Sequence, residues 1–141
     1  MPQIFNVQRK VPISGNTFSP YVNELIKNVV ETNGREFSAA FVSDRRMKEL
    51  NKLFRGKDST TDVLSFPHEP DEFDPDRNNL GDIVISVEQA AKQAEENVLT
   101  LENEIKQLIL HGVLHLCGYD HETDRGEMNA RELELREKLK I

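Results

Sequence analysis

The chain has 141 residues, a formal net charge of −7 and a single cysteine. This length is enough for one domain with a real hydrophobic core, and one cysteine excludes an intramolecular disulfide. The sequence contains no apolar run long enough to cross a bilayer and no leader that starts charged and turns apolar, so we expect a single soluble, cytoplasmic domain over residues 1–141.

The charge is divided unevenly along the chain. Residues 1–57 hold ten Lys/Arg and five acids, a net charge of +5, whereas residues 58–141 hold eight Lys/Arg and twenty acids, a net charge of −12. The overall acidity argues against a nucleic-acid partner, but a basic half can attract a polyanion locally. Solvated helix faces explain the same charges equally well.

Hydrophobic periodicity and turn residues predict four strands and five helices. In chain order these are a strand over residues 2–8, a helix over 20–32, a strand over 36–42, a helix over 44–54, strands over 62–66 and 80–86, and helices over 87–97, 101–117 and 124–139. The stretch 67–79 is rich in prolines and acids and is predicted as a loop. Because strands come early and interleave with helices, we predict an α+β fold with one small mixed β-sheet and helices packed on it.

Several helix starts carry capping residues. Ser19 is expected to cap the first helix, with Pro20 at its first position. Ser86 is expected to cap the helix over 87–97, with Gln89 completing a capping box, and Thr100 to cap the central helix. These signals place the start of the histidine-bearing helix close to residue 101.

Three of the four histidines lie within eleven residues, at positions 111, 115 and 121. Because residues four apart on a helix share a face, His111 and His115 project together. Gly118 can end the helix in the left-handed conformation, so the following turn can bring His121 back to the first two rings. The pattern predicts a metal site at the C-terminal end of the central helix, with one position open as in catalytic zinc sites. Ordinary core or surface histidines are the alternative.

The spacing H-x-x-x-H-x-x-G-x-x-H is that of the metzincin proteases, whose catalytic glutamate follows the first histidine. Here that residue is Gly112, which cannot transfer a proton. Either another group accepts the proton, or the metal lowers the pKa of bound water sufficiently. We expect Cys117 to be a small buried apolar residue pointing away from the metal, Met128 to belong to the core, and His68 to be exposed.

Three segments are distinctive in combination and in this order: Arg55 to Pro67, with Thr-Asp-Val-Leu-Ser-Phe-Pro, Leu80 to Ser86, and His111 to His121, with its Gly-Tyr-Asp-His ending. This combination resembles the bacterial YbeY family of metal-dependent endoribonucleases. The resemblance implies a single-strand-specific endoribonuclease for small-subunit (16S) ribosomal RNA processing and ribosome quality control. Its implied partners are single-stranded ribosomal RNA, the small ribosomal subunit and its assembly factors, with no membrane. The chain departs from many members at Ser59-Thr60, where they have a basic residue and proline.

The resemblance also assigns roles to residues. It implies one divalent ion, Zn²⁺ first, on His111, His115 and His121, and a functional arginine at Arg55. Three histidines suit nickel, copper and iron as well, so the residues alone leave the metal open.

The chemistry of phosphodiester cleavage supports a cation beside the metal, because negative charge concentrates at phosphorus. Arg55 suits this role, since a guanidinium can bind two phosphate oxygens, although a solvated helix end is the alternative. Asp120 and Glu122 flank His121 and could orient its ring or relay a proton, or could simply be turn residues. Three hypotheses follow: a metal-dependent endoribonuclease, a non-catalytic ribosome-assembly factor with a structural metal, and a metzincin-like peptidase. The residues leave open whether water or the RNA 2′-hydroxyl attacks, and the oligomeric state.

Overall fold

The computed structural model describes residues 3–69 and 71–141, and its strands form a four-stranded sheet in the order β1-β2-β4-β3. β1 (Gln3–Asn6), β2 (Glu36–Val42) and β4 (Asn79–Ser86) run parallel, and β3 (Val63–Pro67) pairs antiparallel with β4. The predicted α+β fold with one small mixed sheet is therefore confirmed.

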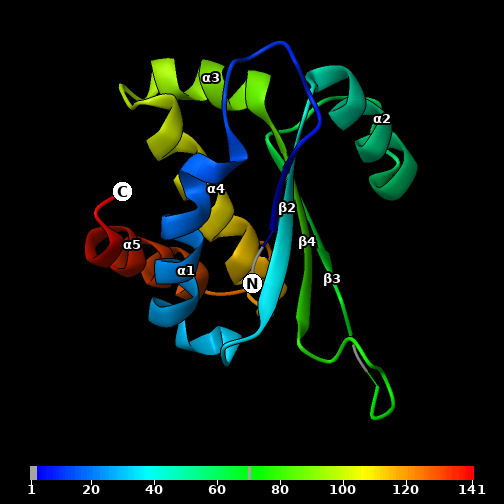
Figure 1. Ribbon diagram of the computed structural model, residues 1–141, viewed down its shortest axis with the longest axis vertical. Helices are drawn as coiled ribbons and strands as arrows, with labels where there is room; N and C mark the ends of the chain where they lie inside the picture. Colours follow the sequence, from blue (N-terminus) through cyan, green and yellow to red (C-terminus); the bar gives the residue numbers. More distant parts are fainter. Residues whose placement is uncertain (1–2, 70) are drawn as a thin grey trace.

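Helices cover the two faces of this sheet unequally (Figure 1). α1 (Ser19–Asn28), α4 (Leu101–Leu116) and α5 (Glu127–Leu139) lie on one side, and α2 (Asp44–Arg55) lies on the other. α3 (Val87–Glu96) follows β4 directly and packs against α4. The histidine-bearing helix α4 is thus enclosed between the sheet and the outer helices.

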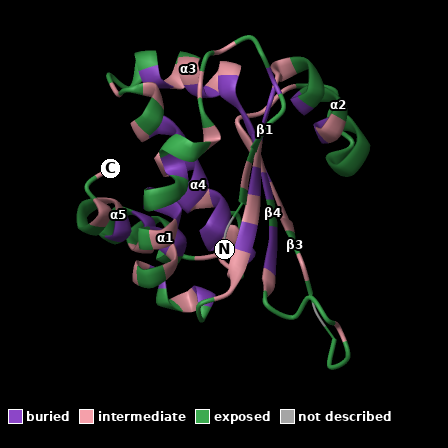
Figure 2. Ribbon diagram, viewed as in Figure 1, coloured by how far each residue is buried: buried purple, intermediate pink, exposed green. Residues whose placement is uncertain are grey.

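Burial explains why α4 holds a fixed position. Nine of its 16 residues are buried, and its apolar side chains join the main core. Much of the α4 ribbon is coloured as buried in Figure 2. Phe18 and Phe41 pack edge to face in the same core, with ring centroids 5.4 Å apart. A smaller cluster of Val42, Met47 and Leu64 lies beneath α2 on the other side of the sheet. A helix buried on most of its faces cannot shift without disturbing this packing, so α4 is a rigid platform for a site.

The helix caps agree with the sequence in part. The Ser86 hydroxyl accepts from the Gln89 backbone N–H at 3.3 Å, and the Thr100 hydroxyl accepts from the Asn103 N–H at 3.1 Å. The expected capping box is wrong, because the Gln89 side-chain amide donates to Asp44 Oδ2 at 2.9 Å instead. A tertiary contact from α2 has replaced the local one.

The first helix differs at both ends from the prediction. A 3-10 turn over Gly15–Phe18 precedes it, so Phe18 is the cap residue and Ser19 is already helical. The α-helix ends at Asn28, and a short 3-10 segment, Val30–Thr32, continues to the predicted stop at 33–34. The Thr32 hydroxyl donates to the Val29 carbonyl at 2.9 Å, which stabilises this tighter turn.

The two ends of the chain show further differences. The predicted strand 2–8 begins outside the described residues and is a described strand only to Asn6, because the Gln8 side chain bonds both backbone groups of Val11 and closes a turn. The last helix begins at Glu127 rather than 124, since the Asp124 carboxylate accepts from the backbone N–H groups of Gly126 and Met128.

The segment between β3 and β4 is a loop, as predicted, and residue 70 within it lies outside the described part (Figure 1). His68 is half-buried rather than exposed, because its Nε2 lies 2.8 Å from Asp74 Oδ2. Within residues 3–69 and 71–141, none of the helices combines the length and apolarity that crossing a bilayer requires.

Candidate metal centre

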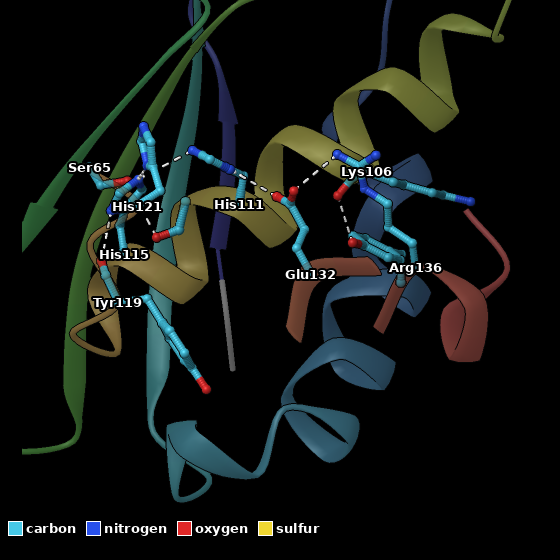
Figure 3. Close-up of polar contacts among 10 residues, drawn as sticks. Ser65, Lys106, His111, His115, Tyr119, His121, Glu132 and Arg136 are labelled. Carbon is cyan, nitrogen blue, oxygen red and sulfur yellow. Dashed lines mark hydrogen bonds and ion pairs between the residues drawn. The ribbon is translucent and has the colours of Figure 1, made fainter. Parts of the chain in front are cut away.

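His111 and His115 project side by side from the last turns of α4, and His121 faces them from the turn that follows (Figure 3). Nε2 of His115 lies 3.2 Å from Nε2 of His111 and 3.2 Å from Nδ1 of His121. All three residues offer ring nitrogens within 4.8 Å of one another. The predicted clustering of the three histidines is confirmed.

The end of α4 produces this arrangement. Gly118 has φ of +103°, in the left-handed region that favours glycine. The next residue, Tyr119, donates its N–H to the Leu114 carbonyl at 3.1 Å, which closes the helix end. The chain then reverses through Asp120, whose carbonyl accepts from the N–H groups of Thr123 and Asp124. The reversal places His121 opposite the two helical rings.

Each helical histidine is oriented through its other ring nitrogen. Nδ1 of His115 donates to the Tyr119 carbonyl at 2.9 Å. Nδ1 of His111 donates to Oε1 of Glu132, on α5, at 2.8 Å. Both acceptors require the proton on Nδ1, so both Nε2 lone pairs point at the shared centre.

This geometry fits a divalent metal ion. Two lone pairs facing each other at 3.2 Å repel unless a cation lies between them. Tetrahedral ligands at 2.0–2.1 Å from a zinc ion lie about 3.3 Å from one another, close to the separations found here. Burial, and then the charge of neighbouring His111, lower the pKa of His115, which favours the neutral ligand form. The three histidines can therefore hold a metal ion.

Glu132 is a site residue that the sequence reading missed. It is 7% exposed and also accepts from Nη2 of Arg136 at 3.2 Å (Figure 3). Burial raises the pKa of Glu132, but the hydrogen bond from His111 and the nearby cationic groups outweigh it and leave the pKa lowered. The sequence did contain a signal for Glu132. It lies on the same helix face as Met128 and Leu135, which is the buried face, and an acidic residue is buried only when it is paired.

A second network holds the turn in place. The Tyr119 hydroxyl donates to Glu31 Oε2 at 2.7 Å, and Arg131 donates to both Glu31 oxygens at 2.9 Å. The hydrogen bond from Arg131 is the main cause that lowers the pKa of Glu31 to about 2. Three distant segments thus meet at Glu31, which holds Tyr119, the residue whose carbonyl orients His115.

Gly112, the residue in place of the protease glutamate, packs against the sheet. A Cβ atom there would lie 2.9 Å from Cδ1 of Ile83 on β4, closer than real Cβ contacts occur. The Ser65 hydroxyl on β3 donates to the Gly112 carbonyl at 3.3 Å. Gly112 therefore permits the close approach of α4 to the sheet, and a side chain at this position would require Ile83 or the helix to shift.

The three rings open into a cleft of about 580 Å³. Arg55, at the end of α2, lines this cleft together with the histidines and residues of β3. Arg55 is exposed and forms no hydrogen bond or ion pair with any residue in the described part of the chain. Of the cations in residues 1–57, Arg55 is the one that the structure places in the cleft wall.

Acidic groups make up the rest of the charge in the cleft. Asp62, Asp120 and Glu122 line it together with the single arginine. Asp120 is exposed, and its Oδ1 accepts from the Glu122 backbone N–H at 3.0 Å. The uneven charge along the chain does not become a basic cleft, so an anion here depends on Arg55 and on a bound cation.

Two other sequence expectations are confirmed. Cys117 is partly buried against the core, and burial is the main cause that raises the pKa of its thiol to about 11. Met128 is 1% exposed and belongs to the core. Cys117 is not among the described groups of ligating side chains that could hold a metal.

Known proteins resemble this chain over nearly all of its length. Residues 3–140 match the family described as Endoribonuclease YbeY. A relative of that name from Nautilia profundicola is 50% identical over 107 residues, 76% of this chain and 74% of its own. One from Thermodesulfovibrio yellowstonii is 34% identical over 139 residues, 89% of this chain and 86% of its own. The solution structure of TM1509 from Thermotoga maritima aligns with a TM-score of 0.66 and 30% identity over 99% of this chain and 89% of that one.

Proposed function

The chain belongs to the YbeY family of endoribonucleases, and we propose that it is a metal-dependent endoribonuclease that cleaves single-stranded RNA. The observation that carries the proposal is the convergence of three imidazole nitrogens in a cleft that also holds a free arginine. We propose further that residues 1–141 act as a single endoribonuclease domain.

We propose that His111, His115 and His121 bind one Zn²⁺ ion. Three neutral imidazoles leave one tetrahedral position open, as catalytic zinc sites do. When bound, the ion supplies Lewis acidity toward a phosphate oxygen and lowers the pKa of water toward neutrality. Glu132 and the Tyr119 carbonyl hold two of the rings in the orientation that binding needs.

Arg55 is proposed to bind the phosphate and to stabilise the charge that develops during cleavage. Its guanidinium has no competing partner among the described residues, so both of its donor pairs are available. The acidic rim of Asp62, Asp120 and Glu122 repels phosphate elsewhere in the cleft. Together these charges select a single position for the reacting phosphate, between Arg55 and the metal-binding nitrogens.

Asp120 is proposed as the group that relays the proton. Its Oδ1 is held by the Glu122 N–H, and Oδ2 has no hydrogen-bond partner among the described residues. A carboxylate oxygen at the rim of the cleft, next to His121, is accessible to a reacting hydroxyl or to water. Asp120 would thus accept the proton that Gly112, in the position of the protease glutamate, cannot accept.

The family resemblance supports a cellular role in small-subunit (16S) ribosomal RNA processing and ribosome quality control, in the cytoplasm. The proposed partners are ribosomal RNA, the small subunit and its assembly factors. Depletion of the protein in its host is expected to leave 16S precursors with unprocessed ends, and a His115→Ala copy is expected not to restore them.

The direct test uses purified protein and a labelled single-stranded RNA oligonucleotide. Wild type is expected to cleave it, a chelator to stop cleavage, and His115→Ala to abolish it. His68→Ala is the matched control, because His68 pairs with Asp74 outside the cleft. RNA cleavage that continues unchanged in His115→Ala would exclude this site as the catalytic centre. Metal analysis of the native protein distinguishes zinc from nickel, copper and iron.

The second candidate function is that of a non-catalytic assembly factor. The hydrogen bonds that anchor the histidines to the rest of the fold favour it. His111 and His115 are anchored to α5 and to the turn, so a metal here would also brace the fold. This candidate function would be supported if wild type binds ribosomal particles tightly and neither wild type nor the His variants cleave RNA. The peptidase hypothesis is weakened further, because position 112 is a glycine and any side chain there would press on Ile83.

A further inference from the structure

A second pocket, of about 470 Å³, continues the metal cleft along α4. Asp62 and His111 line both cavities. Glu104, Leu108 and His111 line the second pocket from one face of α4, and Glu104 lies about 10 Å from His111 along the helix axis. The two cavities therefore adjoin at Asp62 and His111, and the second extends from there along α4.

The second pocket contains a buried carboxylate with few donors. Glu104 is 4% exposed, and its side chain accepts only from Asn97 Nδ2 at 3.3 and 3.5 Å among the described residues. No described lysine, arginine or histidine forms an ion pair with it. Buried carboxylates are normally satisfied by several donors or by a cation. Glu104 thus has acceptor capacity left for N–H groups of a ligand.

The remaining walls suit a flat, uncharged ligand. Gln107 and Asn97 supply amides that can donate or accept, and Leu99 and Leu108 supply apolar contact. Nε of Arg136 is buried and has no hydrogen-bond partner among the described residues. The pocket carries more acidic than basic groups, with Asp62, Glu104 and Glu132 against Arg136 and His111, so it disfavours a phosphate. A nucleobase meets all of these conditions.

We propose that this pocket binds the base of the nucleotide next to the cleaved phosphate, and that it selects guanine. The proposal rests on the endoribonuclease function proposed above. Guanine presents adjacent N1–H and 2-amino donors, which one carboxylate can accept together, as Glu104 would. Its O6 accepts from an amide or from Arg136. Adenine, cytosine and uracil lack this donor pair.

Binding of mononucleotides tests the pocket without relying on cleavage. Guanosine 5′-monophosphate is expected to bind the metal-loaded protein at least about tenfold more tightly than inosine 5′-monophosphate, which lacks the 2-amino group. Calorimetry measures both affinities, and NMR shifts locate the base near residues 97–107. Equal affinity for the two nucleotides would overturn the proposal.

Substitutions sharpen the assignment to Glu104. Glu104→Gln is expected to remove the preference for guanosine over inosine monophosphate while leaving the metal content unchanged. Glu102→Gln is the matched control, because it is an exposed acid on the same helix. If Glu104→Gln does not fold, Gln107→Phe, which fills the pocket from its rim, is expected to weaken guanosine monophosphate binding about tenfold. A retained preference in a folded Glu104→Gln variant would contradict the inference.

Mapping of cleavage products separates this inference from the proposed function. Two results together would support both the guanine pocket and the endoribonuclease proposal. Wild type would cleave mixed-sequence RNA next to guanine, and this cleavage would be lost when inosine replaces that guanine. Cleavage without any base preference overturns the guanine pocket and leaves the endoribonuclease proposal standing. Selective binding of guanosine monophosphate by a protein that cuts no RNA overturns the endoribonuclease proposal and leaves the pocket.

Discussion

Nδ1 of His111 and Oε1 of Glu132 lie 2.8 Å apart, although 21 residues separate them along the chain. The contact ties the C-terminal part of α4 to the middle of α5 and directs Nε2 of His111 to the candidate metal centre. Glu132, which is buried, in turn binds the partly exposed Arg136, so a chain of three polar groups extends from the centre to the second pocket.

This contact predicts that Glu132 controls metal affinity. Glu132→Ala is expected to lower zinc affinity about 10- to 100-fold, because His111 loses the acceptor that fixes its ring. Glu132→Gln keeps an acceptor oxygen and is expected to lose less. Competition with a chromophoric chelator measures the affinities. Glu137→Ala, an exposed acid on the same helix, serves as the control, and equal affinities for all four proteins would contradict the prediction.

Removal of metal is expected to leave the fold intact. The three histidines are not members of the hydrophobic core clusters, which bury the inner faces of α4 and the sheet. A chelator should therefore preserve the circular dichroism spectrum but lower the melting temperature. Zinc at 100 times its dissociation constant is expected to add about 2.7 kcal/mol of stability. His115→Ala should show no such gain, and loss of secondary structure on chelation would refute the expectation.

Gly112→Ala tests the close packing of α4 on β4. The new methyl group meets Cδ1 of Ile83, and overpacking of this kind is expected to cost about 1–3 kcal/mol. Urea denaturation measures the loss. Ile83→Val removes Cδ1, so the double variant should recover part of the stability lost by Gly112→Ala, after correction for Ile83→Val alone. If the losses in free energy of unfolding from Gly112→Ala and Ile83→Val simply add in the double variant, the contact with Ile83 is not the cause of the destabilisation by Gly112→Ala.

The Glu31 network predicts a pH dependence of stability. Arg131 is the main cause that lowers the pKa of Glu31 from 4.5 to about 2, so the unfolded chain binds this proton more readily than the folded one. The resulting stability is present above pH 4.5 and is lost as the pH falls toward about 2, and solvent screening makes it smaller than the pKa change alone would give. Glu31→Gln is expected to reduce the pH dependence of the free energy of unfolding between pH 4.5 and about 2. Glu24→Gln is the control and should not change it, because Glu24 forms only an exposed ion pair with Lys27.

Arg55 is expected to affect catalysis far more than stability. Arg55→Ala should lower kcat by about 100-fold or more, because one charged donor to the developing charge is lost. Its free energy of unfolding should change by no more than about 0.5 kcal/mol, since the side chain is exposed and without partners in the described residues. Arg55→Lys should recover only part of the rate. Lys57→Ala is the control. If it lowers kcat as much as Arg55→Ala does, the proposed role of Arg55 is contradicted.

Local patterns in the chain were sufficient to predict the order of the strands and helices and the clustering of the three histidines. The spacing of His111, His115 and Gly118 predicted a helix end with two rings on one face, because helix geometry depends only on nearby residues. The same holds for the caps at Ser86 and Thr100 and for the order of strands and helices. The mixed sheet followed from that order, since strands separated by a helix run parallel, whereas strands joined by a loop can pair antiparallel.

Contacts between distant segments were beyond these patterns. Glu132, Glu31 and the Ile83 contact of Gly112 come from other elements, so their positions depend on how α4 packs and not on any local period. Gln89 shows the same effect at small scale, because a partner on α2 replaced its predicted local bond. Spacing along a helix places ligands on one face, but the groups that orient them and bound the cleft are brought together by burial of the core.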